Sequence, residues 1–146
     1  MTHPIPNLEN HFSNLGDKFS TAVQATAIAN PHWVIRNASL AKDLHLDLFG
    51  QQADSFLAAF SGAQALPSSQ PLAMVYAGHQ FGHYVSQLGD GRGLLLGEIA
   101  TTKGRFDLHL KGAGPTPYSR MGDGRAVLRS SIREYLAGEA LHTLGI

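Results

Sequence analysis

Two identical Gly-Asp-Gly-Arg tetrapeptides are the residues of this chain whose types and spacing point to chemistry. They occupy positions 89–92 and 122–125, and a third glycine-rich segment, Lys111 to Gly114, lies between them. Glycine lets the backbone adopt positive φ and approach an anion closely, so that consecutive peptide N–H groups can bind phosphate oxygens. Arginine and lysine supply matching positive charge. The pattern predicts a site for a phosphate-bearing ligand.

The two copies are not equally strong evidence for a ligand site. The first fits neither the G-x-G-x-x-G pattern, because Leu94 holds its last position, nor the P-loop pattern, because no Gly-Lys-Ser/Thr follows. Its simplest alternative is a tight hairpin turn with an exposed arginine. The second copy favours a ligand more strongly, since a helix is expected to follow it, and the N–H groups and dipole at a helix start attract anions.

Lys111 and Glu134 form the next pair, one at the end of an expected strand and the other on the expected helix. If the helix packs against the sheet, they can form the Lys–Glu ion pair by which kinases hold a lysine on ATP phosphates. The alternative is that Glu134 is a solvated residue paired with a neighbour such as Arg133. Arg125, Arg129 and Arg133 would form a basic stripe on this helix.

His79 and His83 have the i, i+4 spacing that can bind zinc on a helix. The glutamate of the H-E-x-x-H motif is missing, and Gly78 and Gly82 disfavour a stable helix there. A metal hydrolase is therefore a distant alternative, and we assign no metal ligand in this chain.

A sheet and a C-terminal helix must position these residues. Segments 84–88 and 94–99 flank the first tetrapeptide, and Asp-Gly is a favoured turn pair, which predicts a β-hairpin. The period-two alternation of 106–111 predicts a strand. Apolar residues at helical spacing over 127–144 predict a helix from about Arg125 onward, with an apolar stripe that has nothing in the chain to cover it.

The N-terminal half contains shorter elements. Residues 1–30 read as an irregular arm, Trp33 to Ile35 as a short strand, and Asn37 as the N-cap of a helix ended by Gly50. A second helix is expected over Ala53 to Phe60, with a loop before residue 72. The predicted fold class is α+β, a small, mostly antiparallel sheet with a packed helix and an N-terminal helical arm. We divide it into an arm with short helices, 1–75, and a nucleotide-binding part, 76–146.

Composition limits the class of partner. The 146 residues are enough for one domain with a core, and the formal net charge of zero argues against nucleic acid or a membrane surface as partner. Residues 103–134 are nonetheless basic, with seven Lys/Arg and three acidic residues. With no cysteine, no signal peptide and no apolar stretch of spanning length, we expect a soluble, cytoplasmic protein.

Four longer motifs resemble the selenoprotein O (YdiU) family: Tyr76 to Gly82, Gln87 to Arg92, Leu110 to Arg120, and Gly122 to Glu134. The resemblance extends from about Asn10 to Ile146. It implies the N-lobe of a protein-kinase-like fold, with ATP bound in a flipped orientation and AMP transferred to Ser, Thr or Tyr hydroxyls of proteins. A pseudokinase that binds ATP without transfer, and ordinary phosphate transfer, are the alternatives.

The resemblance also implies roles by position. The nucleotide-contacting positions are Gly89, Gly91, Arg92, Lys111, Asp123 and Gly124, and Glu134 is the ion-pair partner of Lys111. Family members are several hundred residues long, so the resemblance implies a truncated lobe. It places the catalytic aspartate and the ligands of Mg²⁺ or Mn²⁺ beyond residue 146, and we expect the 146-residue chain alone to be inactive.

Overall fold

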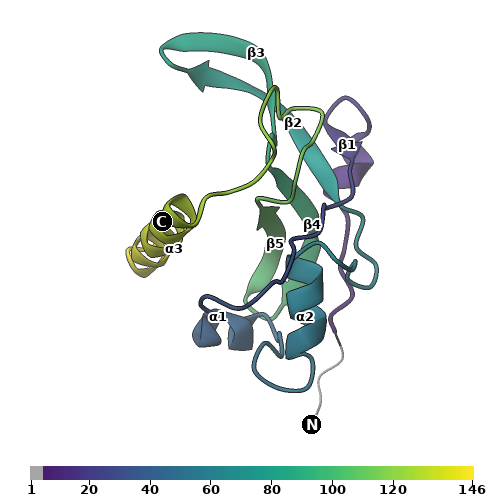
Figure 1. The fold of residues 1–146 in the computed structure, drawn as a ribbon, viewed down its shortest axis with the longest axis vertical. Helices are drawn as coiled ribbons and strands as arrows, with labels where there is room; N and C mark the ends of the chain where they lie inside the picture. The colour runs from purple at the N-terminus through teal and green to yellow at the C-terminus, as the bar shows by residue number, and fades with distance from the viewer. Residues whose placement is uncertain (1–4) are drawn as a thin grey trace.

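The computed structural model describes residues 5–146, and an open antiparallel sheet lies at their centre (Figure 1). The α+β fold class is confirmed, as a small kinase-like N-lobe. In chain order the elements are the 3₁₀-helix η1 (Phe12–Leu15), β1 (Ser20–Ala22), α1 (Ala38–Asp43), α2 (Ala53–Phe60), β2 (Leu72–Gln80), β3 (His83–Gly89), β4 (Gly93–Thr101), β5 (Gly104–Lys111) and α3 (Leu128–Thr143).

The sheet is organised around β2, a strand that the sequence analysis did not predict. It pairs with β1 and β4 through its first residues and with β3 through the rest, while β5 pairs with β4. The predicted hairpin of β3 with β4 is wrong, because β3 folds back on β2 through a tight turn. Phe81 and Gly82 make this turn with φ of 54° and 80°. The first tetrapeptide therefore connects two strands that both pair with β2.

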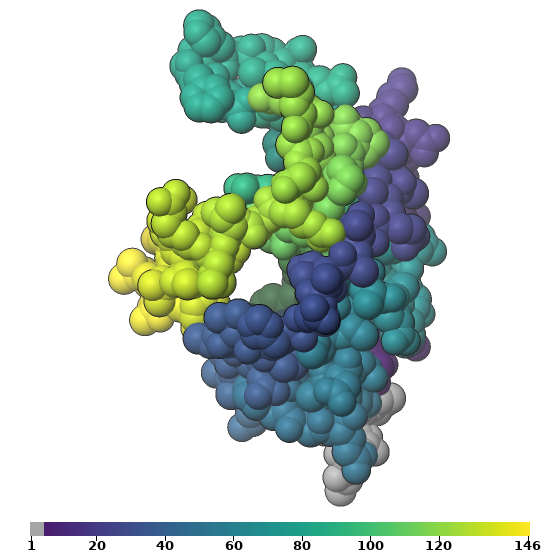
Figure 2. Space-filling model, viewed as in Figure 1, coloured from purple at the N-terminus to yellow at the C-terminus, as the bar shows by residue number. Residues whose placement is uncertain are grey.

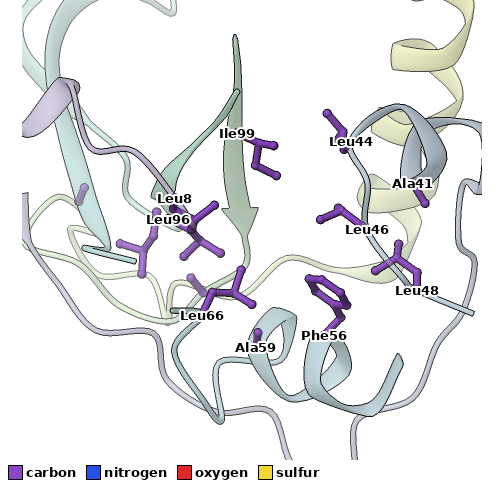
Figure 3. Close-up of a cluster of buried hydrophobic side chains, with 13 residues drawn as sticks. Leu8, Ala41, Leu44, Leu46, Leu48, Phe56, Ala59, Leu66, Leu96 and Ile99 are labelled. Carbon is purple, nitrogen blue, oxygen red and sulfur yellow. The ribbon is translucent and has the colours of Figure 1, made fainter. Parts of the chain in front are cut away.

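The hydrophobic core lies between β4 and the segment that carries the two short helices (Figure 3). Phe56 of α2 and Leu94 of β4 are the largest fully buried side chains. Three leucines at and after the end of α1 belong to the same buried cluster: Leu44, Leu46 and Leu48. Burial of such side chains is the main favourable term in folding, so this core fixes β4 and, through it, the turn that precedes it.

Some N-terminal predictions need correction. Trp33 to Ile35 is irregular rather than a strand, because Trp33 packs edge-on against Phe60 at 6.2 Å. The Asn37 side chain accepts from the Leu40 N–H and caps α1, as predicted, but α1 ends at Asp43 rather than near Gly50. The predicted bounds of α2 are confirmed. The arm expected to be irregular contributes β1 and η1.

Helix α3 stands off from the sheet, and none of its residues is buried (Figures 1 and 2). Lys111 and Asn37 reach it, through Glu134 and Glu139. The apolar stripe is left exposed, at Leu128, Ile132, Leu136 and Leu141. Within residues 5–146, no helix has both the length and the apolar character needed to cross a membrane.

Candidate functional site

The glycine-rich segments meet around one cavity of about 850 Å³. It lies between the β2–β3 hairpin, the start of β4, the end of β5 and the loop from 117 to 125. Its volume is within the range of small-molecule sites. All six nucleotide-contacting positions named from the sequence line it: Gly89, Gly91, Arg92, Lys111, Asp123 and Gly124.

The first tetrapeptide is a turn whose own peptide groups are largely occupied. The N–H of Asp90 donates to Met74 O at 2.9 Å, and that of Gly91 donates to Gly89 O at 2.8 Å. A run of free N–H groups, which the sequence suggested, is therefore not what this turn presents. Among residues 5–146, none accepts a hydrogen bond from the exposed Arg92 side chain. The charge that this turn offers to an anion is thus Arg92.

Asp90 anchors the turn rather than facing the cavity as a free carboxylate. One oxygen accepts from the Met74 N–H at 3.1 Å and lies 3.3 Å from the His109 ring. Tyr76 adds a phenol that donates to Gly89 O at 3.2 Å. Partial burial and the nearby Asp90 carboxylate raise the pKa of Tyr76, so the phenol stays a neutral donor at physiological pH.

The two glycines of this turn are explained by packing rather than by positive φ, which neither adopts. A Cβ on Gly89 would lie 2.4 Å from Cγ of Tyr118, and one on Gly91 would lie 2.8 Å from the Tyr118 carbonyl oxygen. Tyr118, with Thr116 and Ser119 beside it, was not assigned a role from the sequence. The available signal was the hydroxyl-rich run directly after the third glycine-rich segment.

The second tetrapeptide is built differently. The Asp123 carboxylate accepts from the Arg125 N–H at 2.9 Å. The Arg125 guanidinium donates to three carbonyls, those of Thr26 at 2.8 Å, Ala27 at 3.0 Å and Gly112 at 3.3 Å. Arg125 therefore fastens the N-terminal arm to the loop after β5, so the basic stripe expected from it does not form as an exposed row.

The helix also starts later than expected. Val127 is extended, with φ −77° and ψ 141°, and α3 begins at Leu128. The second tetrapeptide thus lies before the helix and not at its N-terminal turn. The dipole falls off within the first turn of a helix, so it contributes less at Gly122 to Arg125 than the sequence suggested.

Lys111 and Glu134 meet as predicted, with Lys111 Nζ 3.3 Å from Glu134 Oε1. Both side chains are largely exposed. Lys111 lines the cavity, whereas Glu134, on α3, does not line it and accepts a hydrogen bond from the lysine. The pair is thus an exposed contact between the end of β5 and α3.

A possible metal-ligating cluster lies elsewhere, where the arm crosses β4. Glu9, His11 and Glu98 are the one group of three such side chains close enough to share an ion within residues 5–146. Arg105 already occupies it, 2.7 Å from Glu9 and 3.5 Å from Glu98. Burial alone would raise the pKa of Glu98, but hydrogen bonds from His11 and the Phe12 N–H outweigh burial and lower it. The cluster is an ion-pair network that docks the arm.

His79 and His83 lie on β2 and β3 at the hairpin tip, not on a helix. His79 packs edge-on against Tyr84, with ring centroids 5.6 Å apart. The i, i+4 argument for zinc therefore does not apply to them, since that spacing brings two histidines together on a helix.

Comparison with known proteins agrees with this geometry. Residues 5–146 match the family described as protein adenylyltransferase SelO. The chain is 60% identical over 141 residues to a protein nucleotidyltransferase YdiU of Pseudomonas entomophila, covering 94% of this chain and 29% of that protein. It is 55% identical over 139 residues to the Ectopseudomonas mendocina protein of the same name, covering 94% and 28%. The chain therefore spans under a third of the length of these relatives, and it belongs to the SelO family of protein adenylyltransferases.

Proposed function

We propose that this chain forms the ATP-binding part of a protein adenylyltransferase that transfers AMP from ATP to Ser, Thr or Tyr hydroxyls of proteins. The observation that carries the proposal is the single cavity that joins Arg92, Lys111 and both Gly-Asp-Gly-Arg turns. Arg92, in the turn before β4, and Lys111, at the end of β5, bring two cations to this cavity, which suits a polyphosphate better than an apolar ligand. The names of the relatives support a nucleotide as the substrate.

The cavity residues would divide the work of holding the nucleotide. Arg92 and Lys111 would neutralise phosphate charge, and Glu134 would keep Lys111 extended toward the cavity. Gly89 and Gly91 shape the turn that carries Arg92, while Asp123 and Gly124 would contact the nucleotide from the opposite wall. The residues present fit ATP in charge and in available space.

AMP transfer needs more than these residues. A protein hydroxyl must attack the α-phosphorus as the bond to pyrophosphate breaks, which requires a base for the hydroxyl proton and a cation such as Mg²⁺ or Mn²⁺ to neutralise the developing charge. The two aspartates that line the cavity, Asp90 and Asp123, are engaged by backbone N–H groups. We therefore propose that the base and the metal ligands lie outside residues 1–146, and that this chain alone binds ATP without transferring AMP.

The same observation favours one alternative, an ATP-binding pseudokinase that transfers nothing. The test is to incubate the protein, at the full length of its relatives, with magnesium, ATP and a protein acceptor, and to measure the acceptor by mass spectrometry. Addition of AMP is the expected result. Addition of phosphate would instead show a kinase, and an unmodified acceptor with ATP bound would show the pseudokinase.

A substitution locates the phosphate. Lys111→Ala should reduce AMP transfer at least about a hundredfold, because a phosphate-bound charge acts in the transition state. Lys103→Ala is the matched control, since Lys103 pairs with Asp43 at 2.7 Å and does not line this cavity. Equal transfer by the Lys111 variant and the control would show that the phosphate lies elsewhere.

A further inference from the structure

The segment from Thr116 to Ser119 lies directly against the first Gly-Asp-Gly-Arg turn. Thr116 Oγ1 donates to the carbonyl oxygen of Asp90 at 2.7 Å, and Ser119 Oγ donates to that of Gly91 at 2.5 Å. Between these two bonds, the ring of Tyr118 packs on Gly89 with no room for a Cβ. Three consecutive residues of the turn are thus each held by a different side chain of one short segment.

This segment is itself ordered by its own hydrogen bonds. The Thr116 N–H donates to Ser119 Oγ at 2.7 Å, and the Tyr118 N–H donates to Thr116 Oγ1 at 3.1 Å. The Tyr118 hydroxyl lies 2.7 Å from Thr21 Oγ1, on β1. Each hydroxyl that grips the turn is therefore positioned by a second bond, so little side-chain freedom is lost when ligand binds.

The consequence for the turn is that all four of its carbonyls are engaged. Tyr76 donates to Gly89 O, Thr116 and Ser119 donate to the next two carbonyls, and the Gly112 N–H donates to Arg92 O at 2.6 Å. A free carbonyl oxygen beside a phosphate would repel it. Engaging every carbonyl fixes the peptide dipoles and leaves the Arg92 side chain as the unpaired positive charge of the turn, a preorganised arrangement for an anion.

We propose that Thr116, Tyr118 and Ser119 are positioning residues for the nucleotide, acting through the turn that carries Arg92. Tyr118 and Ser119 also line the cavity, and the role assigned to all three is to hold the turn. The inference rests on the proposed function. It adds three residues to the nucleotide site because they hold the turn that carries Arg92.

The test uses the full-length protein with magnesium and ATP, and measures the KM for ATP in AMP transfer together with ATP affinity by titration. Thr116→Val and Ser119→Ala each remove one hydrogen bond to the turn, and each should raise KM and the dissociation constant about five- to tenfold. Thr116→Ser keeps the hydroxyl and should restore wild-type values. Tyr118→Ala should raise KM, whereas Tyr118→Phe, which keeps the ring on Gly89, should stay within about twofold.

Ser69→Ala is the matched control, because Ser69 Oγ donates to Leu96 O at 2.7 Å, away from this cavity. A purely structural role would lower the fraction of folded protein, and hence the apparent kcat, without changing KM. Wild-type KM in both Thr116→Val and Ser119→Ala would overturn the inference. If Thr116→Val does not fold, Ser119→Ala alone provides the test of the inference.

The two proposals fail in different ways. Wild-type protein that shows no saturable ATP binding would remove the proposed function and this inference together. Wild-type protein that binds ATP, beside folded variants with unchanged affinity, would remove this inference alone.

Discussion

The two Gly-Asp-Gly-Arg turns have the same four residues but differ in which of those residues are held by hydrogen bonds. In the first, the aspartate and the backbone are fastened to neighbouring strands, and Arg92 is left free at the cavity. In the second, Arg125 is the fastened residue, with three carbonyls around its guanidinium. An identical tetrapeptide thus presents an unpaired, cavity-lining arginine in one place and a structural arginine in another.

The glycines differ in the same way. Neither glycine of the first turn has positive φ. Glycine is required at both positions because Tyr118 lies where a Cβ would be. Gly124 of the second turn has φ +70°, and its Cβ position lies 1.9 Å from the carbonyl oxygen of Gly114. The requirement for glycine comes from the neighbours in each case, and the neighbours are not visible in the tetrapeptide itself.

The strongest test of this difference is Gly124→Ala, for which we expect the largest loss of stability. A side chain there must adopt positive φ and displace backbone, which together cost about 3 kcal/mol. Gly122→Ala is the control, because the nearest atom to its Cβ position is 3.2 Å away and its φ is not positive. Urea unfolding measures both variants, and equal midpoints would contradict the backbone contact at Gly124.

The two arginines should show opposite effects when replaced. Arg125→Ala should cause the next largest loss of stability, whereas Arg92→Ala should weaken ATP binding. Arg125→Ala removes charge-assisted bonds to three carbonyls and should lower the free energy of unfolding by about 2 kcal/mol. Arg92→Ala should leave stability within about 0.5 kcal/mol, since it breaks no bond within residues 5–146, and should weaken ATP binding about tenfold. Each variant is the control for the other. A loss of stability in Arg92→Ala would break the comparison.

Much of the site could be predicted from the sequence because its signals are local. Gly89, Lys111 and Asp123 lie in recognisable glycine-rich motifs, and Asn37 is a strong N-cap. The alternation of residues 106–111 likewise placed β5 correctly. Each of these depends on residue type and short spacing, which one sequence contains.

The errors concern partners that are distant along the chain. β3 pairs with β2 rather than β4, and nothing within the favoured Asp90-Gly91 pair reveals that choice. The run of β2 contains Gly78 and ends in polar residues, so its pattern is weak as a strand. The role of Arg125 depends on Thr26, nearly a hundred residues earlier, and that of Tyr118 depends on Gly89. Tertiary contacts of this kind decide function without changing local pattern.

Alkaline pH should lower the free energy of unfolding through the first turn and not through the second, and by less than the substitutions above. Burial raises the pKa of Tyr76, so the phenol's contribution to stability is fully present below about pH 10 and is lost as the pH rises through the raised value. Its bond to Gly89 O is worth about 0.5 kcal/mol at this exposed position. Tyr76→Phe should show that loss at neutral pH and a flatter decline above about pH 10. Parallel decline in wild type and variant would show that Tyr76 does not support the first turn.

The smallest expected change in stability concerns the ion pair that lies between the two turns. Lys111 and Glu134 are 44% and 61% exposed, and exposed pairs contribute about 0 to 1 kcal/mol because water and salt screen them. Glu134→Gln should therefore change the free energy of unfolding by less than about 0.5 kcal/mol, measured by urea unfolding at low and high salt. Glu139→Gln, on the same helix and bonded to Asn37, is the control. If Glu134→Gln alone lost much stability, and the loss did not depend on salt, the pair would hold α3 to the sheet as a structural contact. Lys111 would then have a structural role, as Arg125 has.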